Sequence, residues 1–244
     1  MAGGTSAVAW LVIMWLAWAG LLFGGLVLGR SRPDEKRRMP IWTRIGSSIA
    51  LTFAAWGWFV AIRHEPANGY ALFIALGMSL GLLGDLFMAS LLPVSQPTLG
   101  GIGAFALGHV AYCAAFLRLS AQASLTAPLP RFLSWSLWLF IGLTGWYFAA
   151  YRGERPGLLH WAALPYSLLL ASTAGLATGI ALQTSTFITA ALGGALFLLS
   201  DLLIAGRLFK KLHWRYLNDV IWLTYGPAQM FIVYSVWGAA RLIS

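Results

Sequence analysis

The sequence has few charged residues and almost no cysteine. Only 9% of its 244 residues are charged, whereas about a quarter are charged in an average soluble domain. This shortage excludes an ordinary soluble domain. The single cysteine, Cys113, lies within an apolar segment, so no intrachain disulfide can form and cysteine usage does not indicate a redox compartment.

Motifs of several enzyme classes are also missing. There is no GxSxG elbow and no Walker loop, and no base neighbours Cys113 in the sequence, so nothing predicts a serine or cysteine nucleophile. Three of the four histidines (His64, His160 and His213) lie at the ends of apolar segments or between them, without HxxxH or HExxH spacing. We therefore expect neither a metal nor a cofactor.

Apolar residues are abundant, at 59% of the chain, and they fall into long runs. A hydrocarbon layer of about 30 Å needs roughly 17–25 apolar residues per helix. The sequence predicts an all-α, polytopic membrane protein with eight transmembrane helices in a single domain over residues 1–244. The expected spans are 7–29, 45–62, 69–91, 99–119, 132–150, 158–179, 187–206 and 217–241.

The basic residues indicate an orientation. The formal net charge of +9 comes from residues between the spans rather than along one face, so we expect no nucleic-acid partner. With the amino terminus outside, the cytoplasmic connections hold 12 of the 16 Lys and Arg residues, as the positive-inside rule requires. We expect a multi-pass protein of a bacterial inner membrane, in contact with membrane lipids, with both termini outside.

An internal repeat is visible at an offset of 116 residues. Residues 77–89 (GMSLGLLGDLFMA) and 193–205 (GGALFLLSDLLIA) are identical at seven of thirteen positions. The same offset aligns His109 with Tyr225 and predicts two four-helix repeats, approximately residues 1–122 and 123–244. Because each repeat has an even number of helices, the halves should be parallel.

Asp85 and Asp201 occupy equivalent places in the two repeats, well inside apolar spans. A charged carboxylate at the centre of a membrane helix costs roughly 2.5–3.5 kcal/mol on insertion scales, so it usually faces the bundle interior and has a function. The alternative is structural, with each aspartate forming a hydrogen bond that fixes the packing of two helices.

Other polar residues are predicted at a similar depth, in the half of the membrane near the cytoplasm. His109, Tyr166 and Tyr225 lie within one or two helical turns of the level of the aspartates, counted at about 1.5 Å per residue. Gln229 is one turn beyond Tyr225, and Tyr112 is three residues beyond His109. Together these residues could surround a site between helices.

These segments resemble the YhhN family of integral membrane proteins, whose characterised members are lysoplasmalogenases. The similarity rests on GLLGDLFM, GAFALGHVAYCAAF, LPYSLLLAS, GGALFLLSDLLIAGRLF and TYGPAQMFIVYS. It implies eight helices, lysoplasmalogenase activity and catalytic roles for Asp85 and Asp201. The stretch YGPAQ departs from the family pattern by placing glycine and proline after Tyr225, which leaves the helix geometry there open.

The implied reaction hydrolyses the vinyl ether of a lysoplasmalogen to a fatty aldehyde and glycerophospho-ethanolamine or glycerophosphocholine. It needs one protonated acid and one ionised carboxylate, as glycoside hydrolysis does. Ser200 precedes Asp201 and could donate a hydrogen bond to its anion, which makes Asp85 the expected acid. The phosphate is expected near the basic residues that follow Asp201, namely Arg207, Lys210 and Lys211.

Two other functions fit the same composition. Paired carboxylates in repeated halves are also found in secondary transporters, so a proton-coupled carrier of small molecules or lipids is the main alternative. A lipid-binding or scaffold protein without catalysis is a third possibility. Aldehyde release, pH-dependent uptake into liposomes and tolerance of aspartate substitution distinguish the three.

Overall fold

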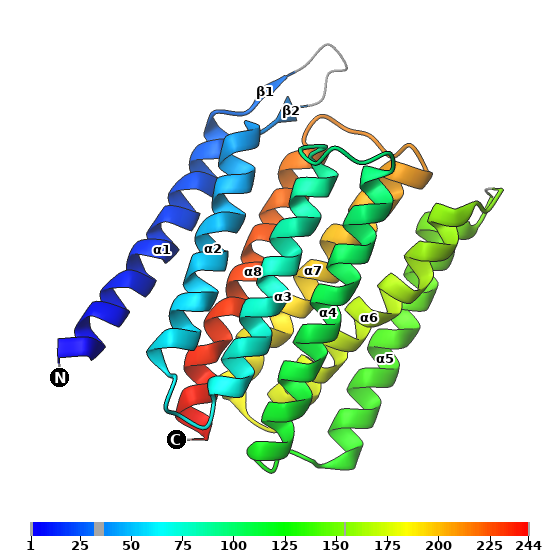
Figure 1. The fold of residues 1–244 in the computed structure, drawn as a ribbon. Coiled ribbons are helices and arrows are strands. Elements are labelled where there is room, and N and C mark those ends of the chain that lie inside the picture. The colour runs from blue at the N-terminus through cyan, green and yellow to red at the C-terminus, as the bar shows by residue number, and fades with distance from the viewer. Residues whose placement is uncertain (1, 32–36, 154, 244) are drawn as a thin grey trace.

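The chain folds as a bundle of helices that run alternately up and down (Figure 1). The computed structural model describes residues 2–31, 37–153 and 155–243, without the side chains of residues 2–4. Within these ranges the eight α-helices are α1 (Ala2–Val27), α2 (Ile41–Ala61), α3 (Asn68–Met88), α4 (Pro97–Gln122), α5 (Pro128–Trp146), α6 (Leu158–Ala181), α7 (Ile188–Phe209) and α8 (Leu217–Leu242). A π-helical turn (Tyr147–Tyr151) extends α5, and a 3₁₀ turn (Ser185–Phe187) precedes α7.

Each predicted span corresponds to one of these helices, so the prediction of eight helices is confirmed. Six of them, all except α2 and α8, are long and apolar enough to cross a membrane. Helices α2 and α8 are long enough but carry more polar residues, among them Ser48 and Gln229, which are buried inside the bundle. The crossing of the membrane by all eight helices stays a prediction.

The all-α prediction implied an irregular connection between α1 and α2, but this connection contains two short strands. Strands β1 (Arg30–Ser31) and β2 (Arg37–Arg38) form a short antiparallel ribbon there. The Arg37 side chain donates hydrogen bonds to the carbonyls of Leu26 and Gly29 at the end of α1. A guanidinium at this position satisfies carbonyls that have no partner in the helix and matches the negative end of its dipole.

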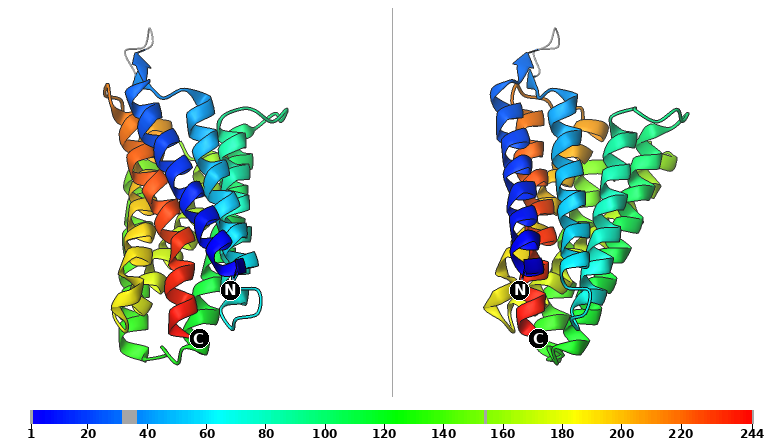
Figure 2. Two further views of the ribbon diagram at one scale, coloured as in Figure 1. Left: turned by 90° about the vertical axis from the view of Figure 1, so that its left-hand side faces the viewer. Right: turned by 60° about the vertical axis from the view of Figure 1, so that its left-hand side comes forward.

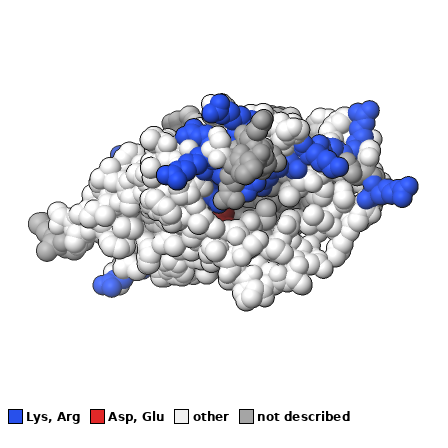
Figure 3. Space-filling model, turned by 90° about the horizontal axis from the view of Figure 1, so that it is seen from above, with Lys and Arg blue, Asp and Glu red and all other residues white. Residues whose placement is uncertain are grey.

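The helices pack around a common centre, with α1 at one edge and α5 at the other (Figures 1 and 2). Around the centre each helix contacts the next in the order α2, α3, α4, α6, α7, α8 and back to α2. Both termini lie at one end (Figure 2). Lys and Arg gather at the other end, over the ribbon and the neighbouring connections (Figure 3). This end is the one that the sequence assigned to the cytoplasm, and its orientation in a membrane stays a prediction.

Helix contacts in the two halves correspond in several respects. The pairs α1–α2, α2–α3 and α3–α4 match α5–α6, α6–α7 and α7–α8, and the contact of α2 with α8 matches that of α6 with α4. The 116-residue offset aligns Gly77 with Gly193. An added Cβ at Gly77 would overlap Tyr112 Cε1 of α4, and one at Gly193 would lie 3.0 Å from the Ala228 carbonyl oxygen of α8. These features support the duplication, which itself stays a prediction.

Small residues allow close approach at the centre of the bundle. An added Cβ at Gly194 of α7 would lie 2.7 Å from the Cα atom of Ala174 in α6, so only glycine fits. Membrane helices gain packing contacts in this way, because lipid provides little hydrophobic drive for their association.

Replacing Gly194 by alanine should therefore push α6 and α7 apart. We expect Gly194→Ala to destabilise the protein by about 1–3 kcal/mol, the usual effect of overpacking, and to lower the midpoint of thermal unfolding in detergent, followed by circular dichroism. Gly103→Ala is the matched control, because nothing lies within 4 Å of a Cβ at that exposed position of α4. Equal midpoints for the two variants would contradict this account.

Candidate active site

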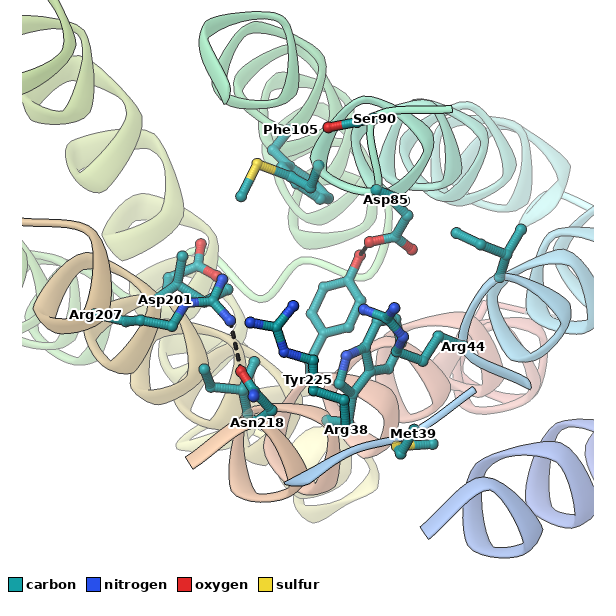
Figure 4. A pocket seen from close by; sticks show the side chains of 16 residues that line it. Arg38, Met39, Arg44, Asp85, Ser90, Phe105, Asp201, Arg207, Asn218 and Tyr225 are labelled. Carbon is teal, nitrogen blue, oxygen red and sulfur yellow. Dashed lines mark hydrogen bonds between the residues drawn. The ribbon is translucent and has the colours of Figure 1, made fainter. Parts of the chain in front are cut away.

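A cavity of about 410 Å³ lies in the basic end of the bundle, and both Asp85 and Asp201 line it (Figure 4). Its volume is within the roughly 300–1,000 Å³ of typical small-molecule sites. Figure 4 shows the two carboxyl groups on opposite sides of the space. The lining residues are Arg38, Met39, Arg44, Ile45, Asp85, Met88, Ala89, Ser90, Phe105, Asp201, Ile204, Arg207, Asn218, Ile221, Trp222 and Tyr225.

Asp85 is held by hydroxyl groups from two other helices. Its side chain is only 6% exposed. Ser48 of α2 donates to Oδ2 at 2.5 Å, and Tyr225 of α8 donates to Oδ1 at 2.8 Å. The Tyr225 hydroxyl in turn accepts a hydrogen bond of 2.6 Å from Gln229 Nε2, one helical turn further along α8. Both oxygens of this buried carboxyl therefore have a donor, as a buried charge requires.

Asp201 has a different environment. Its Oδ2 accepts a hydrogen bond from the Tyr166 hydroxyl of α6, and the residue is only partly buried because it faces the cavity. The two aspartates are close enough for their charges to interact. In the described part of the chain no three His, Cys, Asp or Glu side chains are grouped as a metal site would need.

Three arginines from separate segments line the same cavity. Arg38 comes from strand β2, Arg44 from the first turn of α2 and Arg207 from the last turns of α7. Arg207 Nη1 donates to Asn218 Oδ1 at 2.7 Å, and the Arg44 guanidinium lies 5.9 Å from the centre of the Trp222 ring. The cavity therefore has carboxylates on its helical walls and guanidinium groups toward the ends of the helices.

A family model describes most of this architecture. The model of the YhhN family matches residues 39–236. The chain belongs to the YhhN family. The match includes α2 to α7, most of α8, both aspartates and all the cavity-lining residues except Arg38. Comparisons with curated proteins and with solved structures found no match.

Three of the predicted supporting residues belong to the hydrogen-bond network around the cavity. Tyr225 and Gln229 are connected to Asp85, and Tyr166 is connected to Asp201. Helix α8 continues through Gly226 and Pro227 without interruption. A Cβ at Gly226 would lie 2.8 Å from Leu22 Cδ2 of α1, so this glycine makes room for the outer helix.

The other predicted supporting residues lie behind the cavity wall. His109 is buried with Nδ1 3.0 Å from Thr173 Oγ1, and its ring packs on Phe197 with centroids 4.7 Å apart. Tyr112 is buried against Gly77 and is not among the residues that line the cavity. The structure therefore places neither side chain at the cavity surface.

Ser200 does not make the hydrogen bond that its position suggested. Its hydroxyl donates to the backbone carbonyl of Ile221 at 3.3 Å and so connects α7 to α8. Adjacent residues on a helix point about 100° apart, so Ser200 faces α8 while Asp201 faces the cavity.

Sequence reasoning missed Ser48, Arg38, Arg44 and Asn218. Ser48 was hidden because a serine in an apolar helix often bonds its own backbone. Arg38 and Arg44 lie between predicted spans, where basic residues indicate membrane topology and not a site. Asn218 lies seven residues, or about two helical turns, before Tyr225 on α8. This spacing puts both residues on one face of the helix and could have indicated that Asn218 lines the cavity.

Substituting asparagine for either aspartate tests whether these residues serve packing. Asparagine keeps the size and one acceptor oxygen but removes a charge that is costly in a membrane helix. We expect the thermal midpoints of Asp85→Asn and Asp201→Asn to equal or exceed that of the unmodified protein.

Tyr70→Phe provides the comparison, because it removes a buried hydrogen bond of 2.6 Å to Ser235 far from the cavity. We expect this variant to lose about 1 kcal/mol, which lowers the midpoint by roughly 2–4 °C for a chain of this size. A larger fall for both aspartate variants would assign Asp85 and Asp201 a structural role.

Proposed function

We propose that this protein hydrolyses the vinyl ether bond of lysoplasmalogens, giving a fatty aldehyde and glycerophospho-ethanolamine or glycerophosphocholine. The observation that carries the proposal is the placement of Asp85 and Asp201 on one cavity, with a hydroxyl donor to each from a neighbouring helix. Membership of the YhhN family adds support, since the family is associated with lysoplasmalogenase activity.

The reaction requires one acid and one base beside the same vinyl ether. Transfer of a proton to the outer carbon of the C=C–O unit gives a cation shared between carbon and oxygen. A water molecule then adds to the carbon next to the oxygen and loses a proton to the second carboxylate. The resulting hemiacetal separates into the aldehyde and the glycerol hydroxyl group. Paired carboxylates perform the equivalent steps in glycoside hydrolysis.

The hydrogen bonds support Asp85 as the carboxylate and Asp201 as the proton donor. Both oxygens of Asp85 accept from hydroxyl groups, and Arg44 acts on it electrostatically. Asp201 has one described hydroxyl donor and faces the cavity. This assignment reverses the one expected from Ser200, whose hydroxyl bonds Ile221 instead.

The cavity walls suit a lipid with one long chain. Apolar side chains alternate with the polar groups around it, including Met88, Phe105 and Trp222. Phe105 lies between the two tyrosines of the site, with ring centroids 6.5 Å from Tyr166 and 6.2 Å from Tyr225. In the proposed orientation, the site opens to the cytoplasm of a bacterium and the lipid reaches it from the inner leaflet.

Beyond the aspartates the described part of the bundle contains a layer of buried aromatic rings, which a proton-coupled carrier would have to open. Toward the end with the termini, the fully buried rings of Tyr70, Phe116 and Phe187 pack together, with Tyr70 centroids 5.9 Å and 6.2 Å from the other two. A carrier would need these rings to separate in order to open a route to the opposite side.

Aldehyde release from lysoplasmalogen by the purified protein is the direct test. We expect Asp85→Asn and Asp201→Asn each to lower the rate by at least about 100-fold, the usual contribution of a general acid or base. Glu65→Gln is the control, because Glu65 lies in the connection between α2 and α3 at the opposite end. Full activity of either aspartate variant would refute the mechanism, and pH-dependent uptake without aldehyde release would identify a carrier.

Tyr225→Phe tests the positioning of Asp85. Loss of this hydrogen bond should lower kcat by about 10- to 100-fold with little change in KM. It should cause no further loss in the Asp85→Asn background, because the two residues act as a unit. Tyr234→Phe, which removes a hydroxyl on the same helix bonded to the carbonyl of Leu11, should leave kcat unchanged. A fall in kcat for Tyr234→Phe as large as that for Tyr225→Phe would indicate a general effect on α8.

A further inference from the structure

Three guanidinium groups from distant parts of the sequence face one small space. Figure 4 shows Arg38 between Arg207 on one side and Arg44 on the other, near Tyr225. Arg44 and Arg207 are partly buried, whereas Arg38 is exposed on the ribbon. The arrangement brings positive charge from α2, α7 and the α1–α2 connection to the mouth of the cavity.

The positive charges of these arginines repel one another when they are brought this close together. Arg38 and Arg207 are close enough for their charges to interact unfavourably. Like charges that are partly removed from water repel more strongly than they do in bulk solvent. An anion between them would turn repulsion into attraction, and guanidinium groups suit a phosphate because they donate two parallel hydrogen bonds.

Neighbouring groups hold the arginines in place. Arg207 donates to Asn218, and Asn218 Nδ2 donates to the backbone carbonyl of Arg37 at 3.2 Å. The Arg37 side chain lies 3.5 Å from a carboxylate oxygen of Asp219. These contacts attach the ribbon that carries Arg38 to the start of α8, to which Arg207 is also bonded. The Arg44 guanidinium lies over the Trp222 ring of the same helix, so all three arginines are positioned by contacts with α8.

The arginines stand at a suitable distance from the aspartates. Arg207 is six residues beyond Asp201 on α7, which is about 9 Å along the helix. Arg44 is one turn before Ser48, the residue that donates to Asp85. In a glycerophospholipid, five bonds of about 1.5 Å separate the ether oxygen from phosphorus. Five such bonds span at most about 7.5 Å. The long arginine side chains would supply the remaining reach, so that the phosphate meets the guanidinium groups while the vinyl ether lies between the carboxyl groups.

We propose that Arg38, Arg44 and Arg207 form a binding site for the phosphate of a single-chain glycerophospholipid and set the depth at which its vinyl ether lies. The identity of the lipid rests on the proposed function. Asp85 and Asp201 are the only carboxylates among the described lining residues, and both lie deeper than the mouth. Because no described carboxylate lies at the mouth, we expect the site to recognise the phosphate rather than the amine beyond it and to bind choline and ethanolamine lipids with similar affinity.

Binding can be measured without catalysis by using a saturated ether that the protein cannot hydrolyse. The probes are hexadecyl glycerophosphocholine, hexadecyl glycerophosphoethanolamine and hexadecyl glycerol, which lacks the phosphate, each titrated calorimetrically into protein in detergent. We expect the two phosphate lipids to bind with similar affinity, at least about 10-fold more tightly than hexadecyl glycerol, because charge-assisted hydrogen bonds are lost without the phosphate. Added salt should weaken only the phosphate lipids.

Arginine variants locate the site. Arg207→Gln and Arg38→Gln should each weaken both phosphate lipids by about 10-fold or more and leave hexadecyl glycerol unchanged. The sequence predicted Lys211 near the phosphate, but Lys211 is an exposed cation on the same end of the bundle and does not line the cavity. Lys211→Gln is therefore the matched control. Thermal midpoints confirm that each variant is folded. Arg44→Gln provides a third variant if one of the first two does not fold.

The outcomes separate the two proposals. Equal binding of phosphate and phosphate-free lipids, or an equal loss for Lys211→Gln, would overturn the phosphate site. A strong preference for one amine would overturn the conclusion about the head group. Arginine-dependent binding of the phosphate lipids without aldehyde release from a vinyl ether would keep the site and refute the hydrolase. Aldehyde release that is insensitive to all three arginines would keep the hydrolase and refute the site.

Discussion

The burial of one carboxyl group determines much of the arrangement at the centre of the bundle. Asp85 is almost inaccessible to solvent, so its oxygens depend on donors from the protein. Ser48 and Tyr225 supply them from α2 and α8, which lie on two sides of α3. These two hydrogen bonds connect three helices beside the cavity.

Helices α2 and α8, which are not among the six described helices apolar enough to cross a membrane, both donate to this carboxyl group. Each gives polar side chains to the carboxyl group and to the cavity mouth, from Ser48 and Arg44 on α2 to Tyr225 and Asn218 on α8. The cavity also lies at the end where Lys and Arg gather (Figure 3), so some of the basic residues from which the sequence predicted the membrane orientation are also those that could bind an anion.

The sequence was informative about which helices exist and which two carboxylates line the same cavity, and much less about the direction in which side chains point. Long apolar runs predicted all eight helices, and Asp85, Asp201, Tyr166, Tyr225 and Gln229 come together as depth along the helices suggested. Depth could not separate His109 and Tyr112 from them. In a helix that is apolar on every side, no hydrophobic face marks its rotation. The ribbon and Arg38 depend on contacts distant in sequence, which no local pattern reveals.

The two halves are similar in helix order but differ in the residues that contact each aspartate. Tyr225 donates to Asp85, whereas His109, its counterpart at the 116-residue offset, lies against Thr173 and Phe197. Each aspartate does have a hydroxyl donor from the helix before its own, Ser48 for Asp85 and Tyr166 for Asp201. A duplication would supply two carboxyl groups in equivalent places, which on its own would give them equal properties. The residue that corresponds to Tyr225, His109, contacts Thr173 and Phe197, so Asp85 has two described hydroxyl donors whereas Asp201 has one. Acid and base catalysis by a pair of identical residues needs that difference in environment.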